Sequence, residues 1–583
     1  MRATLAVLAL STALGFGFAS EADAATIYPL DRATILVRSP FDLKVEFAGV
    51  VKAEDVKVTL NGEPAEVVLG KGFTFVEREP GVDASAVMLR AASLAKPGHY
   101  TVEARAGDDV KTVTWDVYAT PAQPKAKNVI FFLGDGLSVA HRTAARLMSK
   151  GMTEGKANGR LNIDGISPVA FVGTSATDAV ATDSANTMSA YMTGHKTAVN
   201  ALGVYADRTK DSLDDPKVET IAEALRRTGG KAIGIVTTAE IEDATPAAVV
   251  SHTRRRSDKA DIALMMFDVK PEVVLGGGSA YFLPKSVPGS KRKDDIDLID
   301  RYRESGYALA TTAAELETAR GTNSGRILGL FHTGNMDVAL DRLQLKKGTV
   351  SKFPDQPGLV KMTEVALEQL AKDPDGFFLM VEGASIDKMS HPMDWERAMY
   401  DTIEFDQAVG AGLAFAAKHP DTLIVVTGDH THGVSVIGTI DDNKPGTEMR
   451  EKVGVYADAG FPNYEDKNGD GYPDNVDVSR RLAIFSSNFP DYYETFRPKM
   501  NGPFEPAVQN EKKEYVANEA YKDVPGAVKR EGNLPRSADT AVHAVDDVVL
   551  QATGPGADGF HGYMEESDIY RVLVDAMAIA PAN

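Results

Sequence analysis

Two short groups of acidic residues and histidines have the types and spacing of metal ligands. Asp429 and His430 are adjacent and directly follow an apolar run, and Asp387 precedes His391 by four residues. On a helix, side chains at positions i and i+4 share one face, so Asp387 and His391 could bind the same ion. Carboxylate oxygens and imidazole nitrogens suit zinc in catalytic sites that keep an open coordination position. Either pair alone is more often a surface hydrogen bond, but both pairs follow strands that we assign to one sheet.

A serine lies where a helix is expected to begin. The sequence Thr182-Asp183-Ser184-Ala185 precedes a stretch of helical period at 186–192. One interpretation is that Ser184 only caps the helix, because serine is a common N-cap residue. The other is that Ser184 is a nucleophile, since the N–H groups and positive dipole end of a helix N-terminus stabilise an anion such as phosphoserine. The position of the serine alone does not separate these interpretations.

Five continuous apolar runs predict the strands that would position these residues. They are separated by stretches of helical period, and strands apolar on both faces are typical of a parallel sheet covered by helices on both sides. Side chains that carry function collect just beyond the carboxyl ends of such strands. Asp135, Glu382, and Asp429 with His430 follow three of the runs, which places them at one edge of the sheet. The runs are residues 129–133, 232–236, 273–275, 377–381 and 423–426.

The N-terminal part has a different pattern, in which apolar and polar residues alternate over short segments with a tight turn at Asn61-Gly62. We therefore expect an immunoglobulin-like β-sandwich at 25–120, a linker at 121–127 and an α/β catalytic domain at 128–583. Residues from about 439 to 535 are rich in Pro, Gly, Asn and charge, and we assign them to an insertion packed near the site. The alternating segments are 43–47, 56–60, 100–104 and 113–117.

Composition narrows the classes of function. The chain has 583 residues, a formal net charge of −20 and no cysteine. The lack of cysteine excludes disulfides, thiolate metal sites and cysteine nucleophiles. The acidic balance excludes a nucleic-acid scaffold, which would need basic patches. An anionic substrate would have to be held by a local group of cations, because the overall field of the protein repels it.

The first residues have the features of a secretory signal peptide. Met1-Arg2 provides a cationic start, residues 3–19 are almost continuously apolar or small, and Ala22-Asp23-Ala24 fits a cleavage site. We therefore expect a signal peptide at 1–24 and a periplasmic or secreted protein. A transmembrane anchor is the alternative, but the run is short for a span and includes polar residues. No later segment of the sequence is long and apolar enough for a stable membrane span.

Five segments of the chain form an ordered set: NVIFFLGDG (128–136), TDSANTMSAYMTGHKT (182–197), DATPAAVVSH (243–252), VEGASIDK (381–388) and TGDHTH (427–432). In this order and at this spacing they resemble the alkaline phosphatases, over residues of about 127 to 575. The resemblance implies an alkaline-phosphatase-like three-layer sandwich with a central, mostly parallel sheet. It also implies a metal-dependent hydrolase that removes phosphate from small monoesters through a covalent phosphoserine.

The resemblance further implies roles for individual residues. Ser184 would be the nucleophile, and Arg256 would bind two phosphate oxygens, for which the planar guanidinium is suited. Arg254 and Arg255 flank Arg256, so a shift by one or two residues is open. Metal ions on both sides of the phosphorus atom would neutralise the charge that spreads over it during transfer.

The implied metal ligands are distributed over three sites. One zinc ion would be held by Asp135, Asp429 and His430, and a second zinc ion by Asp387, His391 and His543. A magnesium ion would be held by Asp135, Thr245 and Glu382. His561 is the alternative to His543 as the last ligand, and His195 and His252 are expected to be structural. The residues expected around these ligands are Asp183, Asp243, Lys388 and His432, of which His432 would hydrogen-bond to a ligand.

Residues 466–477 fit the template of a calcium-binding loop. Oxygen donors occur at loop positions 1, 3, 5, 9 and 12, and glycine stands at position 6, where such loops turn sharply. Asp at position 12 and Pro at position 8 depart from the EF-hand and are more like the calcium repeats of extracellular proteins. The alternative is an acidic turn without metal. The candidate ligands are Asp466, Asn468, Asp470, Tyr472, Asp474 and Asp477.

Other functions are compatible with parts of the sequence. A phosphodiesterase of the same superfamily would commonly carry threonine as nucleophile and lack the third metal site, whereas Ser184, Thr245 and Glu382 are all present. A sulfatase would need a C/S-x-P-x-R motif, and none surrounds Ser184. A calcium-dependent extracellular binding module would explain the sandwich and the calcium loop but not the grouped ligands. Both a monomer and a homodimer are open, as is the physiological phosphate ester.

Overall fold

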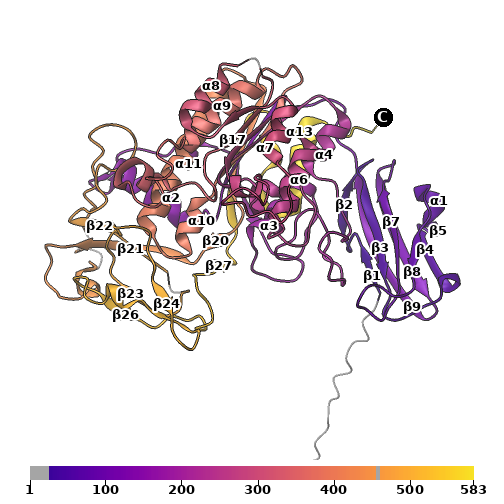
Figure 1. The fold of residues 1–583 in the computed structure, drawn as a ribbon, viewed down its shortest axis with the longest axis horizontal. Helices are drawn as coiled ribbons and strands as arrows, with labels where there is room; N and C mark the ends of the chain where they lie inside the picture. The colour runs from indigo at the N-terminus through magenta and orange to yellow at the C-terminus, as the bar shows by residue number, and fades with distance from the viewer. Residues whose placement is uncertain (1–24, 323, 455–457, 459, 487, 583) are drawn as a thin grey trace, which may run out of the picture.

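The structure is a computed structural model that describes residues 25–582, except residues 323, 455–457, 459 and 487. The expected signal peptide at 1–24 lies outside the described residues. Figure 1 shows a small, mainly β body formed by the first described residues beside a larger α/β body. Among the helices of the described residues, none combines the length and the hydropathy that a membrane span requires.

A ten-stranded sheet forms the centre of the larger body. Its strands are β10 (Asn128–Gly134), β13 (Val169–Gly173), β14 (Ala232–Glu240), β15 (Val273–Gly277), β16 (Ala308–Ala310), β17 (Ile327–Leu330), β18 (Phe377–Gly383), β19 (Thr422–Gly428), β28 (Val548–Thr553) and β29 (Gly562–Glu565). Their spatial order is β16-β17-β15-β14-β18-β10-β19-β28-β13-β29. All neighbours pair in parallel except β28, which is antiparallel to β19 and β13. The predicted mostly parallel sheet is confirmed, and each of the five apolar runs lies in one of its strands.

Alternate side chains of the central strands point into two separate hydrophobic cores. In β10, Val129, Phe131 and Leu133 belong to one core, and Ile130 and Phe132 belong to the other. Because side chains alternate between the two faces of a strand, a strand that is apolar throughout must be covered on both faces. All residues of β10 are buried accordingly.

Helices cover both faces of the sheet and complete three layers (Figure 1). The core that includes Ile130 is closed by α2 (Val139–Lys150), α9 (Leu359–Leu370) and α11 (Trp395–Ala416). The core that includes Phe131 is closed by α3 (Ser184–Thr193), α4 (Ile221–Thr228), α6 (Lys259–Val269) and α13 (Glu566–Met577). This arrangement confirms the expected three-layer α/β fold. The connections contain α5 (Ala244–Ala247), α7 (Leu298–Glu304), α8 (Ala313–Arg320), α10 (Ser385–Ser390) and the hairpin of β11 (Met152–Thr153) and β12 (Lys156–Ala157).

The N-terminal body consists of two small sheets. One contains, in spatial order, β1 (Thr26–Tyr28), β3 (Phe41–Glu46), β7 (Ala86–Ala92) and β6 (Thr74–Val76). The other contains β2 (Ala33–Leu36), β9 (Asp109–Tyr118), β8 (Gly98–Ala106), β4 (Val56–Leu60) and β5 (Glu63–Pro64), which is followed by helix α1 (Ala65–Leu69). Trp115 of β9 packs edge-on against Phe41 of the opposite sheet, with ring centroids 5.5 Å apart. The predicted strands are present, and Asn61 and Gly62 turn between β4 and β5 with positive φ angles of 50° and 86°.

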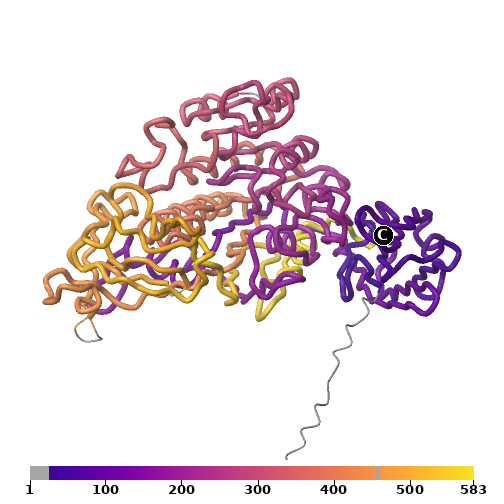
Figure 2. Tube along the Cα trace, turned by 60° about the horizontal axis from the view of Figure 1, so that its bottom comes forward, coloured from indigo at the N-terminus to yellow at the C-terminus, as the bar shows by residue number. Residues whose placement is uncertain are grey.

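Between β19 and β28 the chain forms small paired strands. β21 (Val434–Asp441) pairs with β22 (Arg480–Ser486), β23 (Tyr492–Glu494) with β26 (Val528–Arg530), and β24 (Ala507–Gln509) with β25 (Tyr515–Ala517). The short helix α12 (Met449–Lys452) and a 3-10 helix at Glu519–Tyr521 lie in the same segment. Figures 1 and 2 show this orange segment at the end of the molecule opposite the sandwich. Finally, β20 (Thr431–His432) pairs with β27 (His543–Ala544), which places His432 opposite His543. The returning chain therefore delivers His543 to the carboxyl edge of the sheet.

Candidate active site

Ser184 is the first residue of α3, and Asp183 caps this helix. The Asp183 carboxylate accepts from the Asn186 backbone N–H at 3.1 Å, and the Asn186 side chain accepts from the Asp183 N–H at 3.0 Å. The interpretation of Ser184 as the N-cap is therefore wrong, because that position is taken. Its hydroxyl instead donates to Asp135 Oδ1 at 3.2 Å and lies 3.4 Å from His430 Nε2. The serine faces the predicted metal ligands.

The first group of ligands forms where β10 and β19 end. Asp135 follows β10, and Asp429 and His430 follow β19, which is its neighbour in the sheet. The ligand atoms of these three residues all lie within 4.8 Å of one another. His430 Nε2 is 3.2 Å from Asp135 Oδ1 and 3.6 Å from Asp429 Oδ2. Parallel strands end at the same edge, so residues distant in sequence meet there.

A second group surrounds one carboxylate oxygen, Asp387 Oδ1. It lies 2.6 Å from His432 Nε2, 3.2 Å from His391 Nε2 and 3.4 Å from His543 Nε2. The Nδ1 atoms of His391 and His543 are hydrogen-bonded to the carbonyls of Ala541 and Thr182, at 2.6 and 2.7 Å. A carbonyl partner keeps the proton on Nδ1, so each Nε2 is directed toward the group with a free lone pair in the neutral ring.

Histidines outside this group take other positions. His561, the alternative last ligand, is exposed in the connection before β29. His195 Nδ1 is 2.8 Å from the Tyr205 hydroxyl, and His252 bridges the Gly203 carbonyl and the Glu223 carboxylate at 2.9 Å each. The structure thus brings His543 to the ligands, while His195 and His252 brace neighbouring segments.

Several buried polar atoms of the site have no hydrogen-bond partner among the described residues. They include Asp429 Oδ2, His430 Nδ1 and Thr245 Oγ1. Burial and the neighbouring Asp135 carboxylate raise the pKa of Asp429 well above its usual range, and the same two causes raise the pKa of Glu382 to about 8. Unpaired buried oxygens and crowded carboxylates are both stabilised by cations. Together with the nitrogen donors, this donor set fits bound metal ions.

Thr245 and Glu382 belong to the third predicted site. Glu382 is near the end of β18, and its Oε2 accepts a hydrogen bond of 2.5 Å from the Thr237 hydroxyl of β14. Thr245 lies in α5, which contacts α3 and β18. Thr237, Thr245 and Glu382 are all almost fully buried. Oxygen donors of this kind suit magnesium.

Three basic side chains surround the Asp243 carboxylate. Arg256 Nη2 donates to Asp243 Oδ1 at 3.1 Å, Lys388 Nζ to Oδ2 at 2.8 Å, and Lys259 Nζ lies 3.5 Å from Oδ1. Arg256 Nη1 is also 3.7 Å from Asp183 Oδ2. Burial alone would raise the pKa of Asp243, but the Lys388 and Arg256 charges hold it well below its usual range. Arg256 therefore contacts both Asp243 and Asp183, the cap of the helix that begins at Ser184.

Arg254 and Arg255 donate to backbone carbonyls of residues 207–211 instead of to Asp243. Arg254 donates to the carbonyls of Asp207 and Asp211 at 2.7 and 3.1 Å, and Arg255 donates to the carbonyl of Lys210 at 3.4 Å. Of the three consecutive arginines, Arg256 is the one paired with Asp243 and Asp183. Arg256 is therefore the arginine of the three that contacts Asp183, the cap of the helix that begins at Ser184.

One member of this basic group, Lys259, was not predicted from the sequence, and neither was its partner Glu240. Lys259 forms an ion pair with Glu240, at the end of β14, in addition to its contact with Asp243. Glu240 also pairs with Lys291 at 3.3 Å. The available signal was the short distance in sequence between Lys259 and Arg256, but a lysine there is also compatible with a solvated helix start.

The predicted calcium loop is docked on α11. Tyr472 stacks on Tyr400 with ring centroids 5.2 Å apart, and the Tyr400 hydroxyl donates to the Pro473 carbonyl at 2.6 Å. Asp466 accepts from the N–H groups of Gly469 and Gly471, at 2.8 and 3.0 Å. Among the described residues, the loop carboxylates do not supply three ligand atoms within 4.8 Å of one another. Two sets near the serine do so: Asp135, Asp429 and His430, and Asp387, His430, His432 and His543.

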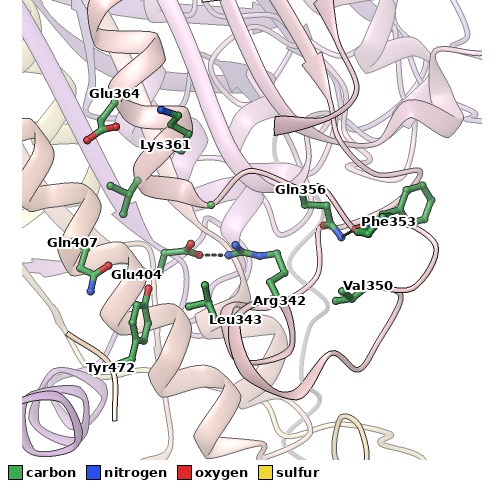
Figure 3. Close-up of a pocket in the computed structure, with 13 residues that line it drawn as sticks. Arg342, Leu343, Val350, Phe353, Gln356, Lys361, Glu364, Glu404, Gln407 and Tyr472 are labelled. Carbon is green, nitrogen blue, oxygen red and sulfur yellow. Dashed lines mark hydrogen bonds and ion pairs between the residues drawn. The ribbon is translucent and has the colours of Figure 1, made fainter. Parts of the chain in front are cut away.

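A pocket of about 360 Å³ is lined by Tyr472 of this loop (Figure 3), and Ser184 is not among its lining residues. Tyr472, Gln407 and the Arg342–Glu404 ion pair line it, with 2.5 Å between the paired atoms. Glu404 also accepts from the Leu359 N–H at 3.2 Å, so this ion pair is already satisfied within the protein. The chemistry suggested by the sequence therefore lies in the ligand groups near Ser184.

Comparison with known proteins shows that the chain belongs to the alkaline phosphatase family. The family model described as alkaline phosphatase matches residues 126–579. The alkaline phosphatase of Gadus morhua is 31% identical over 489 residues, which are 78% of this chain and 92% of that protein. Alkaline phosphatase 3 of Bacillus subtilis is 30% identical over 472 residues, which are 78% of this chain and 90% of that protein.

Solved structures share the fold. The alkaline phosphatase of Thermus thermophilus has a TM-score of 0.55 at 22% identity and covers 79% of this chain and 92% of that one. That of the Antarctic bacterium TAB5 has a TM-score of 0.53 at 21% identity and covers 78% of this chain and 99% of that one. The family match begins after the N-terminal sandwich.

Proposed function

Because the chain belongs to the alkaline phosphatase family and is a phosphoric monoester hydrolase, we propose how it acts. Its substrates are small phosphate monoesters, and the reaction passes through a covalent phosphoserine at Ser184. The observation that carries the proposal is the position of the Ser184 hydroxyl, 3.2 Å from Asp135 Oδ1 and 3.4 Å from His430 Nε2. The serine also opens a helix, where N–H groups and the dipole favour an anion.

Three metal ions fit the donor groups around this serine. Asp135, Asp429 and His430 would hold one zinc ion, and Asp387, His391 and His543 a second. Asp135, Thr245 and Glu382 would hold magnesium. When bound, the cations supply charge neutralisation of the phosphoryl group and lower the pKa values of the serine hydroxyl and of the attacking water.

The residues of the chain account for the remaining chemistry. The deprotonated Ser184 Oγ forms a bond to phosphorus, the ester P–O bond breaks, and the alcohol leaves after gaining a proton. Water then attacks phosphorus, the Oγ–P bond breaks, and inorganic phosphate leaves as the serine regains its proton. Asp135 Oδ1 orients the serine hydroxyl before attack. In-line positioning and neutralisation of charge are the main requirements of such transfers.

Arg256 is proposed to bind two phosphate oxygens. Its guanidinium is held by Asp243 and faces Asp183, which caps the serine helix. A planar fork held in this way needs little reorganisation when phosphate arrives. Lys388 and Lys259, on the same carboxylate, add positive charge to the surroundings.

Export and calcium binding complete the proposal. The sequence features of residues 1–24 support a periplasmic or secreted enzyme, where small phosphorylated compounds are its substrates. Calcium would be held by the loop 466–477, whose Asp466 and Asp470 side chains already accept loop N–H groups. A bound ion would fasten the insertion in a chain that has no disulfides.

The test compares two esters on the purified protein. We expect p-nitrophenyl phosphate to be cleaved at least about a hundredfold faster than bis(p-nitrophenyl) phosphate, at alkaline pH. Chelation should abolish the activity, and zinc with magnesium should restore it. Faster cleavage of the diester would favour the phosphodiesterase alternative. Full activity after verified removal of metal would refute the metal-dependent mechanism.

A further inference from the structure

Besides its contacts with Arg571 and Pro581, the N-terminal sandwich contacts residues 200–219 of the catalytic domain through both backbone and side chains. Phe41 forms a β-bridge with Val218, and the backbone N–H of Asp42 donates to the Lys217 carbonyl at 2.8 Å. The Lys217 N–H in turn donates to the Asp42 carboxylate at 2.9 Å. The start of strand β3 is thus paired with the catalytic domain through a β-bridge and hydrogen bonds of Asp42.

A buried ion-pair network fixes the same segment beside the bridge. Lys44 Nζ lies 2.5 Å from Asp207 Oδ2, 2.6 Å from Glu79 Oε1 and 3.1 Å from Glu46 Oε1. The Lys44 and Asp207 side chains are only 3% and 0% exposed. The three carboxylates are close enough to be metal ligands, but the lysine ammonium occupies the space between them. Buried charges of this kind tolerate little displacement, because an unpaired one is costly.

Arg208 of the same segment extends its side chain to the sandwich. Its guanidinium donates to Glu79 Oε2 and to the carbonyl of Phe47 at 2.6 Å each, and to the carbonyl of Ser85 at 2.9 Å. These acceptors all belong to the sandwich. Consecutive residues Asp207 and Arg208 are therefore both held by the N-terminal body.

The other end of the segment contacts the proposed phosphate site. The Asn200 carbonyl accepts from the Arg256 backbone N–H at 2.9 Å, and the Asn200 N–H donates to Asp183 Oδ2 at 3.0 Å. Leu202 and Thr253 exchange two backbone hydrogen bonds of 2.8 and 2.9 Å. One short stretch of chain thus bonds to the arginine and to the cap of the serine helix.

A second connection runs through Asp207 itself. Its carboxylate binds Lys44, and its carbonyl accepts from the Arg254 guanidinium at 2.7 Å. The Arg254 backbone N–H donates to the Ser212 carbonyl at 3.1 Å. Arg254 is two residues before Arg256, so a displacement of Asp207 would be transmitted to the backbone of the phosphate-binding arginine.

From these contacts we propose that the N-terminal sandwich is a positioning element for phosphate binding: through Lys44 and Asp42 it fixes segment 200–219, which in turn holds Arg256 and Asp183. The inference rests on the proposed role of Arg256. The sandwich lies outside the residues that match the family model, so this role belongs to an added part of the chain. No direct contact between the sandwich and substrate is required.

The test is the Lys44→Met variant of the full, metal-loaded protein, with Lys57→Met as control. Lys57 is an exposed lysine of β4 in the same sandwich. The readouts are inhibition by inorganic phosphate, and KM and kcat for p-nitrophenyl phosphate. Lys44→Met should raise the inhibition constant and KM by about five- to tenfold, with a smaller change of kcat, because a misplaced guanidinium loses part of its paired hydrogen bonds. Lys44→Arg should recover part of the loss.

The same substitution in an Arg256→Ala background separates positioning from general destabilisation. If the sandwich acts through Arg256, Lys44→Met adds no further weakening of phosphate inhibition once the guanidinium is gone. Equal weakening in both backgrounds would overturn the proposal, and so would constants for Lys44→Met that match those of Lys57→Met. Should Lys44→Met fail to fold, Asp42→Asn is judged by the same criteria. If Arg256→Ala alone leaves phosphate inhibition unchanged, the proposed role of Arg256 fails, which is a different outcome.

Discussion

Replacing Ser184 with alanine removes the proposed nucleophile while leaving its surroundings in place. The hydroxyl makes two long polar contacts, 3.2 Å to Asp135 and 3.4 Å to His430. Hydrogen bonds of this kind contribute about 1 kcal/mol each at most, and alanine is the better helix former. Asp183 still caps α3 in the variant. We therefore expect the free energy of unfolding to fall by no more than about 2 kcal/mol.

The effect on catalysis should be far larger. Without Oγ there is no atom to receive the phosphoryl group, and the remaining site can only bind the ester. We expect kcat to fall by at least about a thousandfold, which corresponds to about 4 kcal/mol in the barrier. Metal content should stay at the wild-type level, because Ser184 is not among the proposed ligands.

The assay combines steady-state hydrolysis of p-nitrophenyl phosphate with metal analysis and thermal melting. Acid quenching followed by peptide mass spectrometry should find phosphate on the peptide that contains residue 184, and should find none in the variant. Ser149→Ala is the matched control, since it removes another buried helical hydroxyl, which donates to the Ala145 carbonyl at 2.7 Å. Retention of more than about a tenth of wild-type kcat by Ser184→Ala would refute the nucleophile assignment.

Three further predictions concern the cations of the site. Arg256→Lys should raise the inhibition constant of phosphate nearly as much as Arg256→Ala, about tenfold or more, because an ammonium cannot bind two oxygens in one plane. A wild-type inhibition constant in Arg256→Lys would contradict this prediction. Burial would lower the pKa of His391, but the Asp387 carboxylate raises it to about 9 in the metal-free protein. Zinc must displace that proton, so zinc affinity measured by competition with a chelator should rise about tenfold per pH unit from about pH 7 to 9; a flat profile would refute this. Calcium should raise the melting temperature of wild-type protein but not of Asp470→Ala, and equal shifts in both proteins would refute the calcium loop.

The raised pKa of His391 also has a consequence for the stability of the metal-free protein. A histidine whose pKa is higher in the folded than in the unfolded state stabilises the fold below the unfolded pKa, and this contribution is lost as pH rises through the folded value. The contribution of His391 should therefore fade between about pH 6.5 and 9. Loaded metal replaces the proton, which removes this dependence.

Local patterns in the sequence were sufficient for the layers of the fold. The runs of β10, β14, β15, β18 and β19 are apolar at every position, and only a sheet covered on both faces can bury them. The alternation in the N-terminal part likewise predicted strands of a sandwich. Both conclusions follow from side-chain periodicity, which depends on neighbouring residues alone.

The sequence by itself determined which residue types stand at the strand ends, since Asp135, Asp429 and His430 directly follow buried runs. It did not determine which of three arginines contacts Asp243 and Asp183, that Asp183 is the cap, or that Lys44 binds Asp207. Those outcomes depend on contacts between segments far apart in the chain, whose register is set by packing and backbone pairing rather than by local pattern. The pairing of His432 with His543 is of the same kind, because only the folded insertion brings His543 to the proposed metal ligands.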